Sequence, residues 1–260
     1  MSLPILMTIP HAGVKIPNEV REFCALDEFQ INRDSAAQAR QIFSFTQKVM
    51  AYVSTDIARA IVDVDRAAFD RTMDGVVKLN TRWLTPVYRT PLTETVIQEL
   101  LENYYKPFHQ QINAEWGEDL LMGITCRTFS PNSPPMGQNP SQRRGDICIG
   151  DRYGETMPPG WTAELGECFC DYFDDVTINA PFPGDFITKN YGQDLPWAQI
   201  AVTNGSHISA SDKQRRVLAA LTDFCERRSN DVESPEQRNE PPEKNNDPPQ
   251  HNTDNGESSE

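Results

Sequence analysis

The chain lacks an excess of positive charge, which argues against one class of partner. Its 260 residues carry 24 Lys and Arg against 38 Asp and Glu, a formal net charge of −14. Proteins that bind nucleic acids present basic surfaces to the phosphates, and a negative mean field opposes such contact. We therefore expect neutral, cationic or small partners and no nucleic acid.

Long hydrophobic runs are also missing. The apolar N-terminal stretch LPILMTIP is short, has no basic region before it, and continues directly into sequence that reads as protein core. Such a stretch fits neither a signal peptide nor a membrane span. We expect no membrane contact and, by default, a cytoplasmic location.

A CxxC pair is absent, although the chain has six cysteines. Several of them stand in apolar runs, where a cysteine behaves as a small core residue. Cys168 and Cys170 lie two residues apart in ECFCDYF, which is a weak metal or redox signal. Buried, reduced thiols are the expected state.

Apolar residues are almost absent from the last 32 residues, 229–260. This segment is rich in Pro, Asn, Glu and Ser and carries nine acidic residues against Arg238 and Lys244. Such a composition cannot offset its ordering entropy by burial, so we expect a disordered acidic tail after a single domain over residues 1–228. A solubilising role is the simpler interpretation of the tail, and an interaction role is the alternative.

What is present is an alternation of short apolar runs with longer helical patterns. This alternation predicts an α/β fold, a three-layer sandwich with a mostly parallel mixed sheet flanked by helices. Pro107 should kink or divide the longest helix, and Ser211 should cap the last one. The expected strands or extended pieces are 3–9, 58–64, 120–126, 146–150, 176–179, 185–188 and 197–203, and the expected helices are 34–53, 93–121, 161–173 and 211–228.

Polar side chains follow several of the expected strands. In open α/β sheets, chemistry gathers where the carboxyl ends of strands lead into loops. A lone histidine such as His11 is more often structural than a ligand, but a carboxylate brought close to it makes a ligand role equally plausible. The polar residues at these exits are His11, Asp63, Asp65, Arg66, Asp70, Arg127, Thr203, Asn204 and His207.

A series of motifs in order along roughly residues 3–220 resembles the N-formylglutamate amidohydrolase family. The motifs are PHAGVKIP, INRDSAAQA, TDIARAIVDVDRA, YYKPFHQQI, a Cys-containing strand before TFSP, DICIGDRYG, NAPFPGDFITKNYG and PWAQIAV. Each is weak alone, and their joint order is specific. The resemblance implies a fold like that of zinc carboxypeptidases and aminoacylases, with the site at the strand ends.

The resemblance also implies metal-assisted amide hydrolysis, in which an ion, zinc, polarises a formyl or amide carbonyl and a glutamate takes a proton from water. His11 of PHAG matches the first metal ligand, and Asp34 of INRD matches the carboxylate ligand. Arg66, in a VDxNR-like stretch, matches a residue that holds the substrate carboxylate. His109 of the YYxPxH-like motif would orient a neighbour in the site, or would cap the kinked helix.

Three positions depart from the pattern that the resemblance implies. Arg127 stands where the family has a third metal ligand, a histidine; Ala201 replaces the general-base glutamate; and Asp185 replaces a glycine. An arginine cannot act as a ligand because it stays protonated and has no lone pair to donate. General-base assistance commonly accelerates a reaction by about 10²–10⁴-fold, so the loss at position 201 alone would leave a feeble enzyme.

These departures leave two functions open. The first is an impaired metal-dependent hydrolase of N-formyl or N-acyl amino acid amide bonds, in which His207 or Asp185 supplies a rearranged ligand or base. The second is a catalytically silent relative that binds a small carboxylate or a protein partner. In either case Arg127 should project into the vacated metal position and pair with Asp34 or Asp185, unless it turns outward to solvent.

Overall fold

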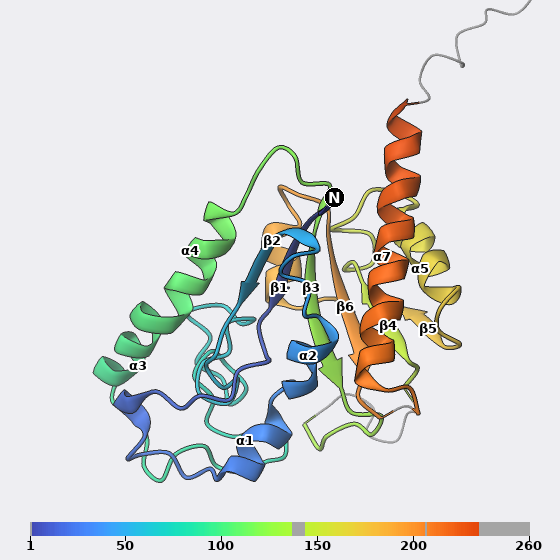
Figure 1. Cartoon of the computed structure of the whole chain (residues 1–260). Coiled ribbons are helices and arrows are strands. Elements are labelled where there is room, and N and C mark those ends of the chain that lie inside the picture. The colour runs from blue at the N-terminus through green and yellow to red at the C-terminus, as the bar shows by residue number, and fades with distance from the viewer. Residues whose placement is uncertain (1, 137–143, 206, 234–260) are drawn as a thin grey trace, which may run out of the picture.

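A six-stranded mixed sheet forms the centre of the protein (Figure 1). The computed structural model describes residues 2–136, 144–205 and 207–233. Four of the five strand pairings are parallel, and only β4 and β6 run antiparallel, which confirms the expected α/β class. The strand order is β2-β1-β3-β6-β4-β5, with β1 at Leu3–Ile9, β2 at Val49–Ser54, β3 at Met122–Phe129, β4 at Ile147–Gly150, β5 at Val176–Ile178 and β6 at Trp197–Thr203.

Helices cover both faces of this sheet and complete the three layers. Alternate residues of β1 point to opposite faces, so Met7 enters one hydrophobic core and Leu6 enters the other. The Met7 side is covered by α2 (Ala37–Ile42), α5 (Trp161–Cys170) and α7 (Ala210–Glu233). The Leu6 side is covered by α3 (Glu94–Leu100), α4 (Lys106–Ala114) and α6 (Phe186–Tyr191).

The second strand does not come from the expected segment. Residues 49–54 form β2, although the sequence pattern placed them in a helix over 34–53, and the short helices α1 (Glu28–Asp34) and α2 occupy part of that range. Residues 58–64, expected as a strand, instead form a turn in which Ile61 N–H donates to the Ala58 carbonyl at 2.8 Å. Their β-branched residues are buried among the helices rather than paired with a strand.

The predicted helix around Pro107 is divided, which is one of the two expected outcomes. Thr93 caps α3 by accepting from the N–H of Val96. A π-helical turn at Leu101–Tyr105 then leads into α4, so Pro107 lies in the first turn of α4. The helix passes directly from the π-helical turn into α4, and proline has no N–H to donate at this junction.

Two other element boundaries differ from the sequence-based expectation. Residues 186–191 form α6 and not an extended piece. The last helix is capped by Ser209, whose Oγ accepts from Asp212 N–H at 3.1 Å, and not by Ser211. It continues to Glu233, five residues into the expected tail, and residues 234–260 of that tail lie outside the described residues.

All six cysteines are free thiols, and five of them are buried as expected, whereas Cys170 is exposed. Within the part of the chain that the structure describes, no helix is both long and apolar enough to cross a membrane.

Candidate functional site

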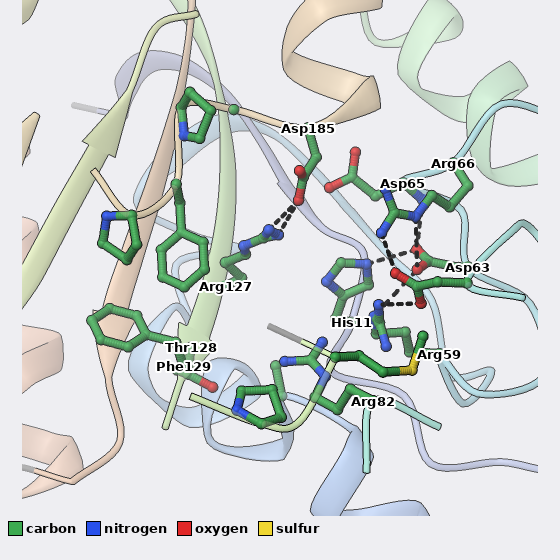
Figure 2. A pocket seen from close by; sticks show the side chains of 18 of the residues that line it. His11, Arg59, Asp63, Asp65, Arg66, Arg82, Arg127, Thr128, Phe129 and Asp185 are labelled. Atoms are coloured by element: carbon green, nitrogen blue, oxygen red, sulfur yellow. Dashed lines mark hydrogen bonds and ion pairs between the residues drawn. The ribbon is translucent and has the colours of Figure 1, made fainter. Parts of the chain in front are cut away.

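A pocket of about 360 Å³ opens where β1 and β3 end, and the segments around it come from distant parts of the chain (Figure 2). Its lining is strongly charged, with six arginines and four aspartates. These are Arg59, Arg66, Arg82, Arg127, Arg144 and Arg152, and Asp63, Asp65, Asp74 and Asp185.

Arg127 projects into this pocket from within β3 and not from the loop after it. Both terminal nitrogens of its guanidinium donate to Oδ2 of Asp185, and the guanidinium lies 5.1 Å from the centre of the Phe182 ring. Of the two partners expected from the sequence, Asp185 is therefore the one that Arg127 contacts. Across the sheet, Arg127 stands beside Ala201 in register.

Asp34 is buried outside the pocket lining, and its carboxylate is engaged elsewhere. Oδ2 accepts from Arg59 at 3.2 Å, and Oδ1 accepts from the backbone N–H of Arg82 at 2.9 Å. The carboxylate thus holds two arginine-bearing segments together at the side of the pocket.

The carboxylate beside His11 is Asp63, at 2.8 Å from His11 Nε2. Burial lowers the pKa of His11 to about 4, with Asp63 opposing this shift, so the imidazole is neutral at pH 7. Although burial opposes it, Lys78, Arg59 and His11 hold the pKa of Asp63 well below its usual range, so Asp63 is ionised. Nε2–H is therefore the donor to Asp63, and Nδ1 of His11 carries the lone pair.

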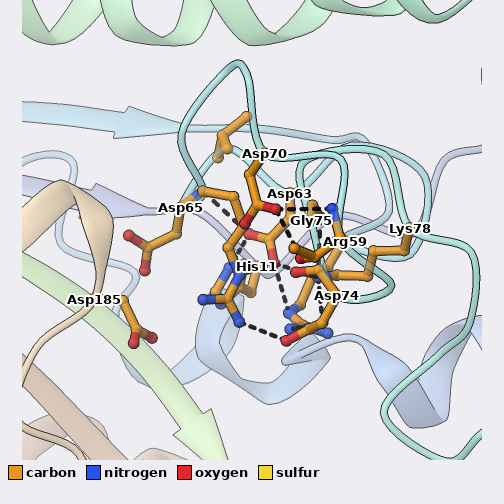
Figure 3. Close-up of polar contacts among 12 residues, drawn as sticks. His11, Arg59, Asp63, Asp65, Asp70, Asp74, Gly75, Lys78 and Asp185 are labelled. Carbon is orange, nitrogen blue, oxygen red and sulfur yellow. Dashed lines mark hydrogen bonds and ion pairs between the residues drawn. The ribbon is translucent and has the colours of Figure 1, made fainter.

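Asp63 and Asp74 hold a buried network of cations (Figure 3). Lys78, with no exposed side chain, lies 2.9 Å from Asp63 and 2.5 Å from Asp74. Arg59 lies 3.2 Å from both aspartates, and Arg66 lies 2.5 Å from Asp74. Arg66, the expected substrate-carboxylate residue, reaches the pocket but already has an anionic partner.

Asp65 differs from the other pocket aspartates because it has no cationic partner within salt-bridge distance among the described residues. Its Oδ1 accepts from the backbone N–H of Ile187 at 2.7 Å, and its buried Oδ2 has no hydrogen-bond partner. Burial, and next the neighbouring Asp185, raise the pKa of Asp65 to about 8. Asp65 is thus a neutral carboxylic acid at pH 7.

His109 and His207 lie outside the pocket lining. Nε2 of His109 donates to the Val64 carbonyl at 3.0 Å, and its Nδ1 accepts from the hydroxyl of Tyr191 at 2.9 Å. His109 therefore fixes the backbone immediately before Asp65 and does not line the pocket. His207 is exposed.

Four pocket arginines were not indicated by the sequence as site residues, namely Arg59, Arg82, Arg144 and Arg152. Arg144 donates to Ser133 Oγ at 2.8 Å and lies 5.0 Å from the centre of the Phe182 ring, and no carboxylate of the described residues forms a salt bridge with it. The nearest carboxylate oxygen to Arg82 is 3.8 Å from its Nε. Burial and neighbouring guanidinium groups lower the pKa of both, that of Arg82 to about 9. Both residues stand in irregular segments without a periodic pattern that could have marked them.

The residues present do not fit the zinc site that the resemblance implies. Both oxygens of Asp34 are engaged by arginine-bearing segments, and the third ligand position is occupied by the permanent cation Arg127. Among the described residues, no three His, Cys, Asp or Glu side chains lie close enough together to hold a metal ion. A structural or catalytic zinc site needs at least three such donors.

Comparisons with known proteins agree on the fold and the family. The family model for N-formylglutamate amidohydrolase matches residues 3–206. The structure of N-formylglutamate amidohydrolase from Ralstonia eutropha JMP134 superposes with a TM-score of 0.73 and 16% identity, covering 88% of this chain and 95% of that chain. The structure of gene product Atu2144 from Agrobacterium tumefaciens superposes with a TM-score of 0.61 and 15% identity, covering 89% of this chain and 92% of that chain. No curated protein matches the sequence. Because the family model spans most of the sequence, this chain belongs to the N-formylglutamate amidohydrolase family.

Proposed function

We propose that this protein binds a small carboxylate, an N-formyl or N-acyl amino acid, in the arginine-lined pocket, with metal-dependent hydrolysis impaired or lost. The observation that carries the proposal is the charge of the pocket. Six arginines line it against four aspartates, of which Asp65 is neutral, in a chain with a formal net charge of −14. A concave site with a net positive charge concentrates anionic ligands, even when the mean charge of the protein opposes them.

Arg82 and Arg144 are the arginines best suited to receive the anion. Asp74 engages Arg59 and Arg66, and Asp185 engages Arg127, so these three guanidinium groups are already compensated. A ligand carboxylate would give Arg82 and Arg144 the anionic partner that they lack at close range. The planar guanidinium fork suits this task because it donates two parallel hydrogen bonds to a carboxylate.

The donor set of the pocket supports impaired hydrolysis. The resemblance places Ala201 at the general-base position, and the Ala201 side chain is fully buried against Phe129, Cys148 and Phe182. His207, a candidate substitute, is exposed, and Asp185, the other candidate, is engaged by Arg127. We infer that no side chain replaces the missing metal ligand or the missing general base.

One observation favours the competing function, hydrolysis of N-formyl amino acids. His11 is neutral and donates to an ionised Asp63, an arrangement that leaves the lone pair of Nδ1 available for a proton or a metal ion. With a pKa of about 4, however, this nitrogen is a weak base at pH 7. Hydrolysis is therefore the second candidate function.

Anion binding can be tested by calorimetric titration with N-formylglycine at pH 7. We expect the wild-type protein to bind it, and Arg82→Gln and Arg144→Gln each to weaken binding by about tenfold to a hundredfold, because each removes a charged donor from a partly desolvated site. Arg40→Gln is the matched control, since Arg40 pairs with the exposed Asp56 and does not line the pocket. Equal losses in all three variants would contradict the assignment of Arg82 and Arg144.

Impairment can be tested by the metal content of the purified protein, followed by an assay of formate release with zinc or cobalt added. We expect much less than one metal ion per chain and slow release of formate at best, because the donor set is incomplete. Near-stoichiometric metal together with rapid turnover would overturn the proposal in favour of the hydrolase.

A further inference from the structure

The least explained polar group in the pocket is the carboxyl group of Asp65. Its side chain is 2% exposed, and Oδ2 is the only buried carboxylate oxygen of the described residues that lacks a hydrogen-bond partner. Leaving a buried polar atom without a partner costs about 1–3 kcal/mol. In Figures 2 and 3 the carboxyl group points toward Asp185, on the same side of the pocket.

The surroundings of Asp65 determine where its proton resides. Oδ1 accepts from the backbone N–H of Ile187 in α6, so this oxygen acts as an acceptor. The unpartnered Oδ2 is then the atom that carries the proton, because a neutral carboxyl group donates from its other oxygen. A proton on Oδ2 gives the pocket one uncharged hydrogen-bond donor among its charged arginines.

The charged and titratable groups that face Asp65 favour its neutral form. Asp185, which precedes α6, and Asp63, on the same loop, oppose a negative charge on Asp65. Arg127 of β3 favours that charge, but its guanidinium is engaged by Asp185. Tyr105, from the π-helical turn, is itself an acid whose own pKa is raised, so it adds no positive charge.

We propose that Asp65 is a specificity-determining residue, which donates a hydrogen bond from Oδ2 to an uncharged oxygen of the ligand. This inference rests on the proposed function, in which the arginines bind the ligand carboxylate. The pocket then selects a monoanion with a carbonyl oxygen, such as an N-acyl amino acid, over a dianion whose second carboxylate would lie close to the Asp185 carboxylate. In the view of Figure 2, Asp65 and Asp185 lie on one side of the pocket and Arg82 lies on the other, as such a two-ended ligand requires.

Three probes of equal chain length test this selectivity by calorimetry on the full chain at pH 7. N-formylglycine has a carboxylate and a carbonyl oxygen, succinate has a second carboxylate in place of the carbonyl, and butyrate has a methyl group there. We expect N-formylglycine to bind at least about tenfold more tightly than either of the others, because only it accepts the Asp65 hydrogen bond without adding charge.

Two substitutions test whether the Asp65 side chain acts as a hydrogen-bond donor or only fills space. Asp65→Asn keeps an N–H donor at the position of Oδ2 and should retain the preference for N-formylglycine, whereas Asp65→Ala should reduce it to less than about threefold. Retention of the full preference in Asp65→Ala would overturn the inference.

The pH profile supplies a readout that does not depend on the alanine variant folding. Between pH 6.5 and 8.5 the wild-type affinity for N-formylglycine should fall about fourfold, as Asp65 loses its proton near pH 8, and Asp65→Asn should show a flat profile over this range. Asp56→Asn, at an exposed carboxylate outside the pocket, is the matched control and should keep the wild-type profile.

The outcomes distinguish this inference from the proposed function. If the wild-type protein binds none of the three probes at pH 7, the proposed function is wrong and this inference is wrong with it. If it binds all three with equal affinity, or if Asp65→Asn keeps the pH dependence, only the role of Asp65 is overturned.

Discussion

Replacing Asp63 by Asn is expected to lower the free energy of unfolding by about 3–5 kcal/mol at pH 7, the cost of breaking a buried ion pair. Asp63 is 1% exposed and contacts His11, Lys78 and Arg59 at 2.8, 2.9 and 3.2 Å. Asparagine preserves the shape of the side chain but removes the negative charge. The fully buried Lys78 is then left with Asp74 as its one anionic partner in the described part of the chain. Urea denaturation followed by circular dichroism measures the loss.

The matched control is Asp56→Asn, which removes a carboxylate from an exposed pair with Arg40. Such pairs contribute about 0–1 kcal/mol, because water screens both charges. A second comparison adds Lys78→Met to Asp63→Asn, which removes the stranded cation and should recover at least about 1 kcal/mol. A loss below about 1 kcal/mol in Asp63→Asn would show that the buried network contributes little to stability.

The same network predicts the direction of acid sensitivity. Although burial opposes the shift, Arg59 and Lys78 lower the pKa of Asp74 to about 2, and the pKa of Asp63 is also well below its usual range. A carboxylate whose pKa is lower in the folded state stabilises the protein above its unfolded pKa, about 3.9, and this stabilisation is lost as the pH falls toward the folded value. The protein should therefore lose stability between about pH 4 and pH 2.

The sheet could be predicted from the sequence where a strand lies in the middle of the fold. The runs LPILMTI and WAQIAVT became β1 and β6 with the expected bounds, because a strand buried on both faces is a continuous apolar run. The run at 58–64 is also rich in aliphatic residues and is buried, but it forms a turn rather than a strand. An apolar composition indicates that a segment is buried. Whether the segment pairs as a strand depends on residues far along the chain.

The site was predictable in its location but not in its pairings. His11 and Arg127 both line the pocket at strand ends, as the sequence indicated. The carboxylate next to His11, however, is Asp63, which lies 52 residues away in sequence, and not Asp34. Which carboxylate meets which cation depends on how the loops fold over the sheet, and no periodic pattern encodes that. For the same reason Arg59, Arg82, Arg144 and Arg152 could not be predicted as pocket residues.

The residues at positions 127 and 201, where the resemblance implies departures, are neighbours in the structure. Arg127 and Ala201 are register neighbours on β3 and β6, and Phe182 contacts the side chains of both. Asp185, the third departure, engages the Arg127 guanidinium. A glutamate at position 201 would compete with Asp185 for Arg127, so the small alanine is compatible with the Arg127–Asp185 pair. Arg127, Asp185 and Ala201 therefore belong to one group of contacts around Phe182.

Asp65→Asn is expected to make the protein more stable than the wild type, by roughly 2–4 kcal/mol at pH 7. The pKa of Asp65 is about 8 in the folded protein, whereas an aspartate in the unfolded chain has a pKa of about 3.9. At pH 7 the unfolded chain is ionised at this position and the folded protein is not, so folding must take up a proton. Asparagine removes that requirement while keeping an oxygen for the Ile187 N–H and a donor toward the pocket.

The stability difference between Asp65→Asn and the wild type should depend on pH. Because the folded state binds more protons than the unfolded state between about pH 4 and pH 8, the contribution of Asp65 to stability falls as the pH rises through that window. The difference between Asp65→Asn and the wild type should thus be small near pH 4 and grow toward pH 8, as measured by urea denaturation at several pH values. Asp56→Asn should show no such growth, since Asp56 is exposed. A stability difference that stays constant with pH would mean that Asp65 is ionised in the folded protein, and the neutral donor inferred for the pocket would then not exist.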